Sequence, residues 1–160
     1  MKRFTVAIAL VVLLQLGGTA SASRQLPLAI CGCRVGAGNL TVRPAVVIYT
    51  VDGAGFLAGS GRSSAHPGRI HWTVWGRNQA FGYGRYWGND CEPDCAQGTF
   101  YTYPIEVHLY RPRLLGGRLL FTRLTVRFTG NPPSYYSRSR GFTLTARYNA
   151  SPRGYFWYRR

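Results

Sequence analysis

The sequence predicts an all-β fold, an antiparallel β-sandwich or a small β-barrel of seven to eight short strands. Beyond residue 22, apolar residues recur with a period of two, and turn residues interrupt them at the short intervals typical of antiparallel sheets. No stretch of this part has the spacing of an amphipathic helix. With 160 residues, 20 of them glycine and 9 proline, the composition is that of one globular domain and excludes large multidomain enzymes.

The first 22 residues have the layout of an export signal. Lys2 and Arg3 form a basic region, residues 4–16 are almost all apolar, and residues 20–22 are the small residues that precede a cleavage site. The apolar stretch is shorter than the roughly 20 residues that a membrane-spanning helix needs. We therefore expect cleavage after Ala22, a secreted, extracellular protein, and a single mature domain of residues 23–160 without a membrane span.

The first predicted strands form a hairpin. Residues 42–51 are rich in β-branched side chains and end at the turn dipeptide Asp52-Gly53, after which Phe56-Leu57 supplies a short partner. Residues 60–68, rich in serine and glycine, form a predicted loop.

Two aromatic-rich strands follow the loop. In residues 69–75, strict alternation places Val74 on the same face as Trp72 and places Trp75 on the opposite face. In residues 79–87, Phe81, Tyr83 and Trp87 share one face, while Gly82 and Gly84 lie on the other. Glycines confined to one face of a strand indicate the close approach of another backbone or of an aromatic ring.

The remaining strands supply most of the expected core. Residues 101–110 turn Ile105, Val107 and Leu109 inward, and Pro104 within them indicates an edge position or a bulge. Residues 142–148 alternate again, and residues 155–158 close the sheet, with Phe156 and Tyr158 expected in the core. The inward residues of the strand at 118–128 are Leu120, Leu124, Val126 and Phe128.

Four cysteines in an exported chain, Cys31, Cys33, Cys91 and Cys95, indicate disulfide bonds, and three pairings are possible. A local bond between Cys91 and Cys95 closes about 5 residues and stabilises by roughly 2 kcal/mol, whereas a link between the two pairs closes about 60 residues and stabilises by roughly 4 kcal/mol. A bond between Cys31 and Cys33 is strained in an extended segment. A four-cysteine zinc site is the alternative, although neither pair has the two-residue spacing usual for zinc.

Residues 88–98 form a predicted loop that contains Asp90, Glu92 and Asp94. The oxygen atoms of these three carboxylates are suited to calcium. In a chain with a net charge of +15, however, ion pairs with neighbouring arginines are the more ordinary role of such acids, and we expect that role.

Residues 70–104 contain four short motifs. They are a W-x-x-W-G strand at Trp72 to Gly76, a G-x-G strand at Gly82 to Gly84, a C-x-P-x-C-A-x-G loop at Cys91 to Gly98, and a strand start at Tyr103-Pro104. Together they resemble the signature of a family of uncharacterised small secreted proteins of high-GC bacteria. The resemblance implies an exported, disulfide-bearing domain with a bond between Cys91 and Cys95, and it supplies no catalytic residues.

The sequence offers little catalytic machinery. It lacks a nucleophile elbow, an H-E-x-x-H motif, a phosphate-binding loop and a dinucleotide fingerprint, so we expect no cofactor. Glu106 and His108 are the best acid/base candidates, because alternate residues project from one face of a strand. A glycosidase needs a second carboxylate across a groove, and three of the five acids share one loop. For a histidine such as His108, a solvated or aromatic-packed position is commoner than a catalytic role.

Arginine dominates the charge, because the only lysine is Lys2 and the mature chain keeps a net charge of +13. Arginine makes bidentate contacts with phosphate and carboxylate groups and stacks on aromatic rings. We therefore expect a non-catalytic cell-envelope or extracellular binding domain, with anionic envelope polymers or acidic lipid surfaces as partners. A small secreted hydrolase acting on wall polysaccharide is the alternative. The expected binding surface comprises Arg138, Arg140, Arg147, Arg153, Tyr155, Trp157, Arg159 and Arg160.

Overall fold

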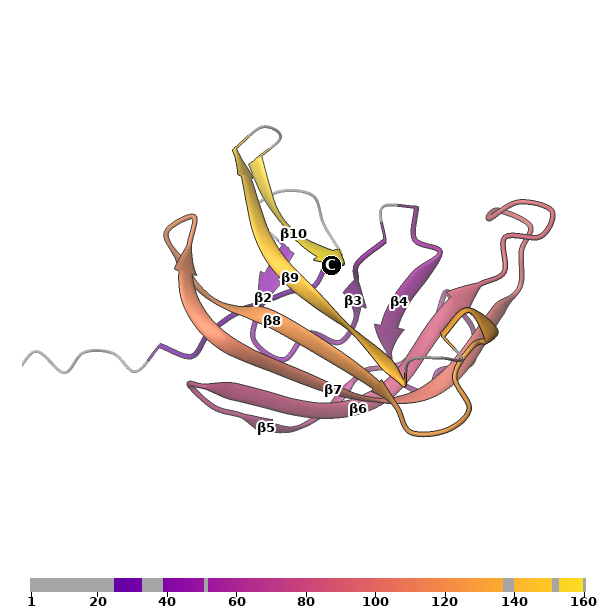
Figure 1. The fold of residues 1–160 in the computed structure, drawn as a ribbon, viewed down its shortest axis with the longest axis horizontal. Coiled ribbons are helices and arrows are strands. Elements are labelled where there is room, and N and C mark those ends of the chain that lie inside the picture. Colours follow the sequence, from indigo (N-terminus) through magenta and orange to yellow (C-terminus); the bar gives the residue numbers. More distant parts are fainter. Residues whose placement is uncertain (1–24, 33–38, 51, 137–139, 151–152, 160) are drawn as a thin grey trace, which may run out of the picture.

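The described chain is built almost entirely from antiparallel β-strands, which confirms the all-β prediction (Figure 1). The computed structural model describes residues 25–32, 39–50, 52–136, 140–150 and 153–159. The predicted export signal lies outside these residues, as do Cys33, Arg138 and Arg160. None of the described residues forms a helix long and apolar enough to cross a membrane.

One large sheet curls into a half-barrel around the main core (Figure 1). Its strand order is β10-β9-β8-β7-β6-β4-β3, and β5 pairs with β6 beyond the end of β4. A separate two-stranded sheet joins β1 (Ala29–Ile30) to β2 (Leu40–Thr41). The strands of the large sheet are β3 (Val47–Ile48), β4 (Gly55–Ala58), β5 (His71–Trp75), β6 (Gln79–Asn89), β7 (Phe100–Leu115), β8 (Arg118–Phe128), β9 (Gly141–Ala150) and β10 (Arg153–Arg159).

The predicted first hairpin is present as β3 and β4. Val47 lies opposite Leu57 and Ile48 opposite Phe56. The turn between them forms because the Asp52 carboxylate accepts a hydrogen bond from the Ala54 N–H at 3.0 Å. Residues 42–46 stay outside the strand, because the carbonyls of residues 44 and 45 accept hydrogen bonds from the Trp72 indole and the residue 70 N–H.

The expected faces of β5 are wrong for its second half. A bulge between Trp72 and Val74 shifts the register against β6, and an extra residue in one strand moves every later side chain to the other face. Trp75 is therefore buried, its indole N–H donating to the Pro27 carbonyl at 3.1 Å, whereas Val74 is exposed. The sequence carries no turn residue at the bulge that could reveal it.

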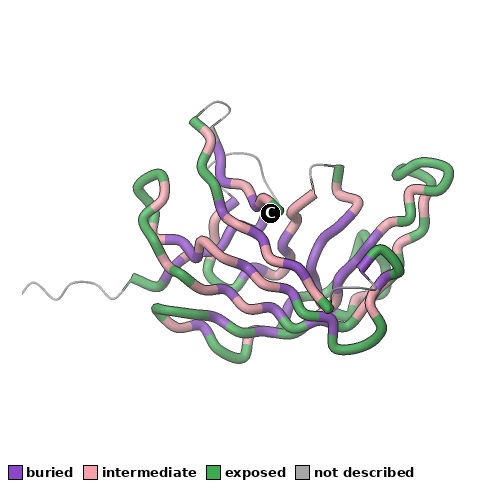
Figure 2. The backbone as a smooth tube through the Cα atoms, in the orientation of Figure 1, coloured by how far each residue is buried: buried purple, intermediate pink, exposed green. Residues whose placement is uncertain are grey.

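The glycine face of β6 is packed as predicted. A Cβ atom on Gly82 would lie 2.9 Å from the Trp72 ring, and one on Gly84 would collide with the backbone carbonyl of Ala58. The opposite face carries Phe81 and Tyr83 into solvent. Figure 2 shows the resulting alternation of buried and exposed residues along the strands.

The long central strands confirm the predicted inner faces. Ile105, Val107 and Leu109 of β7 are buried, as are the four expected residues of β8. β7 lies inside the sheet, but its ladder with β8 begins only at Ile105, so the missing N–H of Pro104 falls where β8 has ended. The Pro104 carbonyl on that side accepts a hydrogen bond from the Thr129 N–H at 3.0 Å. Pro104 therefore lies at an edge only in the sense that β7 has no β8 partner on that side at this position.

The buried and exposed faces of β10 are opposite to those predicted. Tyr155 and Trp157 are buried, and Phe156 and Tyr158 are only half-buried. The N-terminal segment decides the phase, because the Trp157 indole N–H donates to the Ile30 carbonyl at 3.0 Å beneath the sheet. Tyr155 and Trp157 therefore belong to the core and are withdrawn from the expected binding surface.

The close packing of the glycine face leads to a stability prediction. We expect Gly84→Ala to destabilise the protein by about 1–3 kcal/mol, because its methyl group meets a backbone carbonyl that cannot rotate away. Gly76→Ala is the matched control, since its Cβ would meet nothing nearer than the Gln79 carbonyl at 3.4 Å. Urea unfolding measures both, and equal midpoints for the two variants would contradict the close approach.

Candidate binding groove on the outer face

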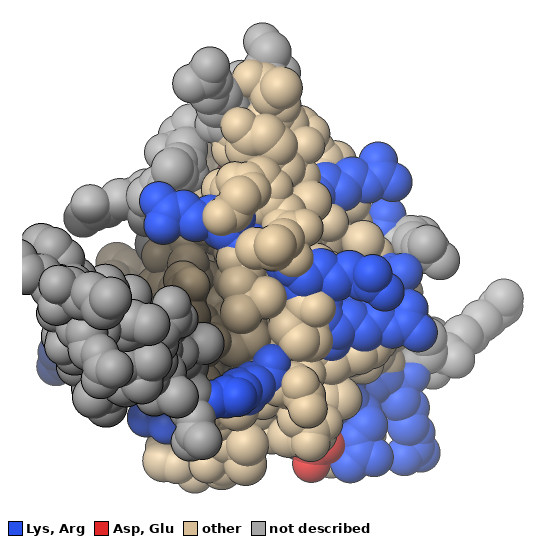
Figure 3. Space-filling model, turned by 90° about the vertical axis from the view of Figure 1, so that its left-hand side faces the viewer, with Lys and Arg blue, Asp and Glu red and all other residues tan. Residues whose placement is uncertain are grey.

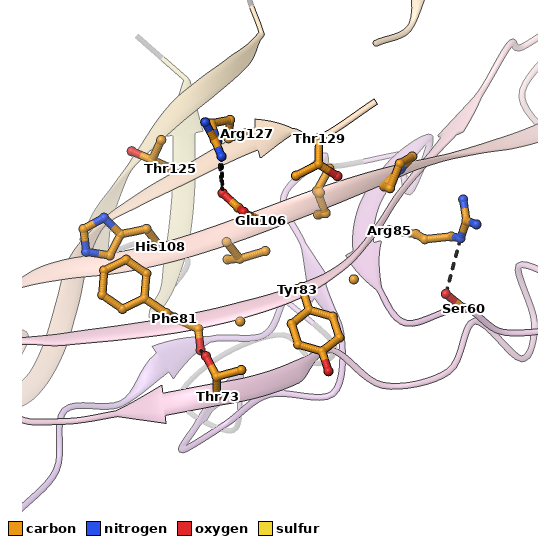
Figure 4. A pocket seen from close by; sticks show the side chains of 15 residues that line it. Ser60, Thr73, Phe81, Tyr83, Arg85, Glu106, His108, Thr125, Arg127 and Thr129 are labelled. Carbon is orange, nitrogen blue, oxygen red and sulfur yellow. Dashed lines mark hydrogen bonds and ion pairs between the residues drawn. The ribbon is translucent and has the colours of Figure 1, made fainter. Parts of the chain in front are cut away.

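The outward-facing side chains of the central strands line a groove of about 800 Å³, here called the outer-face groove (Figure 4). Its floor is the outer surface of β6, β7 and β8, with β5 and residue 60 at one side. Strand alternation fixes this arrangement on β6, β7 and β8, where the outward lining residues alternate with residues turned to the core. The principal lining side chains are Phe81, Tyr83, Arg85, Glu106, His108, Thr125 and Arg127.

Two exposed aromatic rings, two residues apart on β6, line the groove. Phe81 is 37% exposed and Tyr83 is 52% exposed. Each is held by a cross-strand partner: Phe81 stacks on His108 at a centroid distance of 4.1 Å, and Tyr83 stacks on His71 at 4.6 Å. Each ring therefore has one face covered by its partner, and a ligand can contact its other face or its edge at little cost in side-chain entropy.

His108 is packed between two rings rather than solvated. Phe81 covers one side, and Tyr110, two residues along the same strand, stacks at 4.7 Å. Its Nε2 atom is buried without a hydrogen-bond partner, and burial lowers the pKa of the imidazole below its usual value. The predicted outward position is confirmed, and so is the expectation of an aromatic-packed histidine.

The charged groups of the groove form one ion pair and one hydrogen-bonded arginine. Arg127 contacts the Glu106 carboxylate at 2.9 Å across β7 and β8. Both side chains are more than half exposed, so the pair contributes only about 0–1 kcal/mol. Arg85 donates to the Ser60 hydroxyl at 3.3 Å, and Figure 4 shows both interactions. Glu106 is the one carboxylate among the groove-lining residues, so the groove lacks the paired carboxylates of a glycosidase.

The arginines of the C-terminal third do not form one surface. Arg147 of β9 projects from the outer face of the sheet, and its guanidinium lies 5.0 Å from the centre of the Tyr158 ring. Arg159 points to the inner side, where its guanidinium lies 4.7 Å from the centre of the Tyr136 ring. Arg140 is exposed, and the side chain of Arg153 lies outside the described part. The arginines of the expected binding surface therefore lie on both faces of β9 and β10 and not on one.

Other arginines gather on the outer side of the sheet. Arg123 and Arg127 alternate along β8 with buried residues, so both project outward. Arg123 hydrogen-bonds to the Thr145 hydroxyl of the neighbouring strand. In Figure 3, many of the visible Lys and Arg side chains lie along the right-hand side of the face shown, with a small acidic area at its lower end.

The acidic loop is held by backbone hydrogen bonds. The Asp90 carboxylate accepts from the N–H groups of Glu92 and Thr99, and the Asp94 carboxylate accepts from those of residues 96 and 97. No ion pair with arginine forms at these acids in the described chain, so that expectation is wrong. The three carboxylates also do not converge on a point, and the described residues contain no group of three metal ligands.

The disulfide pattern is local. Cys91 and Cys95 are bonded to each other across the acidic loop, which confirms the pairing implied by the family resemblance and excludes a link from either of them to the N-terminal cysteines. Cys31 is also disulfide-bonded, and Cys33 lies outside the described residues.

The outer-face groove lies on other strands than the binding surface expected from the sequence, and it contains none of the expected residues. Phe81 and Tyr83 were assigned to one face of their strand but were not recognised as ligand-binding candidates. The signal was present, because glycines on one face mark the packed side and leave the aromatic face outward. Arg85 and Arg127 follow the same alternation on their strands.

The environment of His108 predicts a pH dependence of stability. Because its pKa is lowered in the folded protein, the unfolded chain takes up the proton first, and stability is lost as the pH falls below about 6.5. We expect His108→Phe, which keeps a stacking ring but cannot titrate, to lose less stability than the wild type between pH 7.5 and pH 5. Urea unfolding at both pH values measures this, and identical losses would contradict it.

Comparisons with protein-family models, with curated proteins and with solved structures gave no match. The chemistry of the outer-face groove is therefore the feature that bears most directly on function. That chemistry combines exposed, pre-oriented aromatic rings with arginines whose charge is only partly neutralised.

Proposed function

We propose that the protein is a secreted, non-catalytic binding domain whose outer-face groove holds an anionic polysaccharide of the cell envelope. The observation that carries the proposal is the pair of exposed rings, Phe81 and Tyr83, beside Arg85 and Arg127. Sugar rings stack on aromatic faces, while guanidinium groups bind carboxylate or phosphate substituents. The groove crosses β6, β7 and β8, a width of about 10 Å at the usual strand spacing, and it is open to solvent as a polymer requires.

Hydrolysis fits the same groove less well. Glu106 is engaged by Arg127 at 2.9 Å, and the described residues that line the groove include no second carboxylate that could share a hydrolytic reaction with it. The nearby His108 has a buried, unpartnered Nε2 atom and is 4.1 Å from the Phe81 ring centre, so it does not present a free proton-transfer group. Binding without turnover is therefore the function that the geometry supports best.

The stacking role of Tyr83 is tested with polygalacturonate oligosaccharides, which carry one carboxylate per sugar. We expect Tyr83→Ala to weaken binding about tenfold, since loss of one stacking contact costs on the order of 1–3 kcal/mol. Tyr101→Ala is the matched control, because Tyr101 has nearly the same exposure, 51%, and is not part of the groove. Isothermal titration calorimetry gives both affinities.

Three outcomes of that titration contradict the proposal. The first is equal weakening by the two tyrosine variants. The second is equal affinity for the fully methyl-esterified polymer, which keeps the sugar rings and lacks the charges. The third is much tighter binding of single-stranded oligothymidylate, which would identify a nucleic-acid surface instead.

The ion pair between Glu106 and Arg127 predicts whether a second substitution strengthens or weakens ligand binding. We expect Glu106→Gln to strengthen binding of polygalacturonate several-fold, because it releases Arg127 from its internal carboxylate and removes a repelling charge from the groove. The effect shrinks as salt rises from 50 to 300 mM, since exposed charges are screened. A hydrolase using Glu106 predicts instead that reducing-end release from the polymer is present in the wild type and abolished in this variant.

A further inference from the structure

The half-barrel leaves its two edge strands, β3 and β10, facing each other across a cleft of about 660 Å³, here called the seam cleft. One wall consists of five consecutive residues of β10, 155–159, and the other includes residues 48–50. Successive side chains of a strand point to opposite faces of the sheet. A cavity that touches five in succession must therefore run alongside the backbone edge, and not over either face.

The edge of β10 that points away from β9 borders the cleft. The Tyr155 carbonyl points into the cleft, where it accepts a hydrogen bond from the Asn39 amide at 2.7 Å. Backbone groups two residues apart point to the same side of a strand, so the N–H and C=O groups of Trp157 and Arg159 also face the cleft. Within the described chain, β10 pairs only with β9, on its other side.

The protein's own N-terminal segment shows that this seam accepts an extended chain. The Cys31 carbonyl accepts a hydrogen bond from the Ile48 N–H of the opposite wall at 2.7 Å, and the Ile30 carbonyl accepts one from the Trp157 indole at 3.0 Å. Gly32, with a φ of +67°, then lies so close to β3 that a Cβ atom would collide with the Ile48 carbonyl. Ile30 and Gly32 line one part of the cleft, and the rest lies beside Tyr49 and Arg159.

Asn39 supplies an independent sign of a missing partner. The residue is 3% exposed and lines the cleft, yet its Oδ1 atom is buried without a hydrogen bond. Buried amide oxygens are almost always satisfied. An N–H group of a chain lying in the cleft would satisfy this one.

We propose that the seam cleft binds an extended peptide by strand addition to β10. A peptide backbone is the ligand whose donors and acceptors alternate at the spacing of a strand edge. One of its N–H groups bonds to Asn39 Oδ1, and an acidic side chain lies at Arg159, in keeping with a net charge of +15. The site is separate from the outer-face groove, and the two share no lining residue.

The test uses a fluorescein-labelled hexapeptide, Glu-Thr-Val-Thr-Val-Glu, acetylated and amidated at its ends, with an acid at each end to suit either direction. We expect saturable binding by fluorescence anisotropy. Because strand addition uses alternate amides, N-methylation of one alternate set should abolish binding, and the other set should tolerate it better. No binding at 1 mM peptide, or binding that neither methylated peptide weakens, would overturn the proposal.

Two variants of one residue separate the backbone from the charge. Arg159→Pro removes the edge N–H and should weaken peptide binding at least tenfold, while Arg159→Gln keeps the N–H and should weaken it only a few-fold. Asn39→Leu should also weaken binding, and the proline variant keeps the test decisive if the buried substitution fails to fold. Equal affinities for the proline and glutamine variants would contradict strand addition. Tyr83→Ala should leave peptide binding unchanged, which distinguishes this site from the outer-face groove.

Discussion

The curl of one antiparallel sheet around an aromatic core is the constraint on which the rest of the structure depends. Tyr86 lies at the centre, in ring contact with Tyr49, Phe128, Tyr136 and Phe142 from four other parts of the chain. On the inner face of β6, Gly82 and Gly84 leave room for two further neighbours, the Trp72 ring and the Ala58 carbonyl. The half-barrel therefore buries rings from several parts of the chain on its concave side, while Phe81 and Tyr83 on its outer face stay exposed.

The same packing makes the inner tyrosines structural and not reactive. Burial raises the pKa of the Tyr49 hydroxyl far above the usual value, so it stays protonated at any physiological pH. The Tyr135 and Tyr86 hydroxyls share a hydrogen bond of 3.0 Å. Arg159 donates to the Tyr136 hydroxyl and covers its ring, which joins the seam cleft to the core.

The sequence was sufficient for the class of fold and for the inner faces of β7, β8 and β9, because period-two alternation reports directly which side of a strand is buried. Alternation gave the wrong buried face where a contact elsewhere in the structure shifts the order of buried and exposed residues along a strand. The bulge in β5 exchanged the exposures of Val74 and Trp75, and the docking of Ile30 beneath β10 exchanged those of Trp157 and Tyr158. Both are tertiary effects, since the deciding partner lies on another strand or in a distant segment.

The lengths of the strands could also not be predicted from the sequence. β7 runs from Phe100 to Leu115, beyond the expected residues 101–110, because its hairpin partner β8 continues to pair with it as far as Arg118. Pairing of this kind is a property of two segments together, and neither segment shows it alone. The candidate groove was predictable only in part: Glu106 and His108 were placed outward, while their neighbours across the strands required the register.

The charge of the protein supports the proposal that the exposed outer face binds an anion. Twenty basic residues stand against five acids, and three of those acids are engaged by backbone N–H groups: Asp52 in a hairpin turn, Asp90 and Asp94 in the disulfide loop. In the described chain, internal neutralisation is limited to the pair between Arg127 and Glu106. The remaining arginine charge must be balanced from outside the molecule. An extended anionic ligand on the outer face does so while releasing the counterions that each partner would otherwise hold, which gives the association an entropic driving force that a neutral ligand lacks.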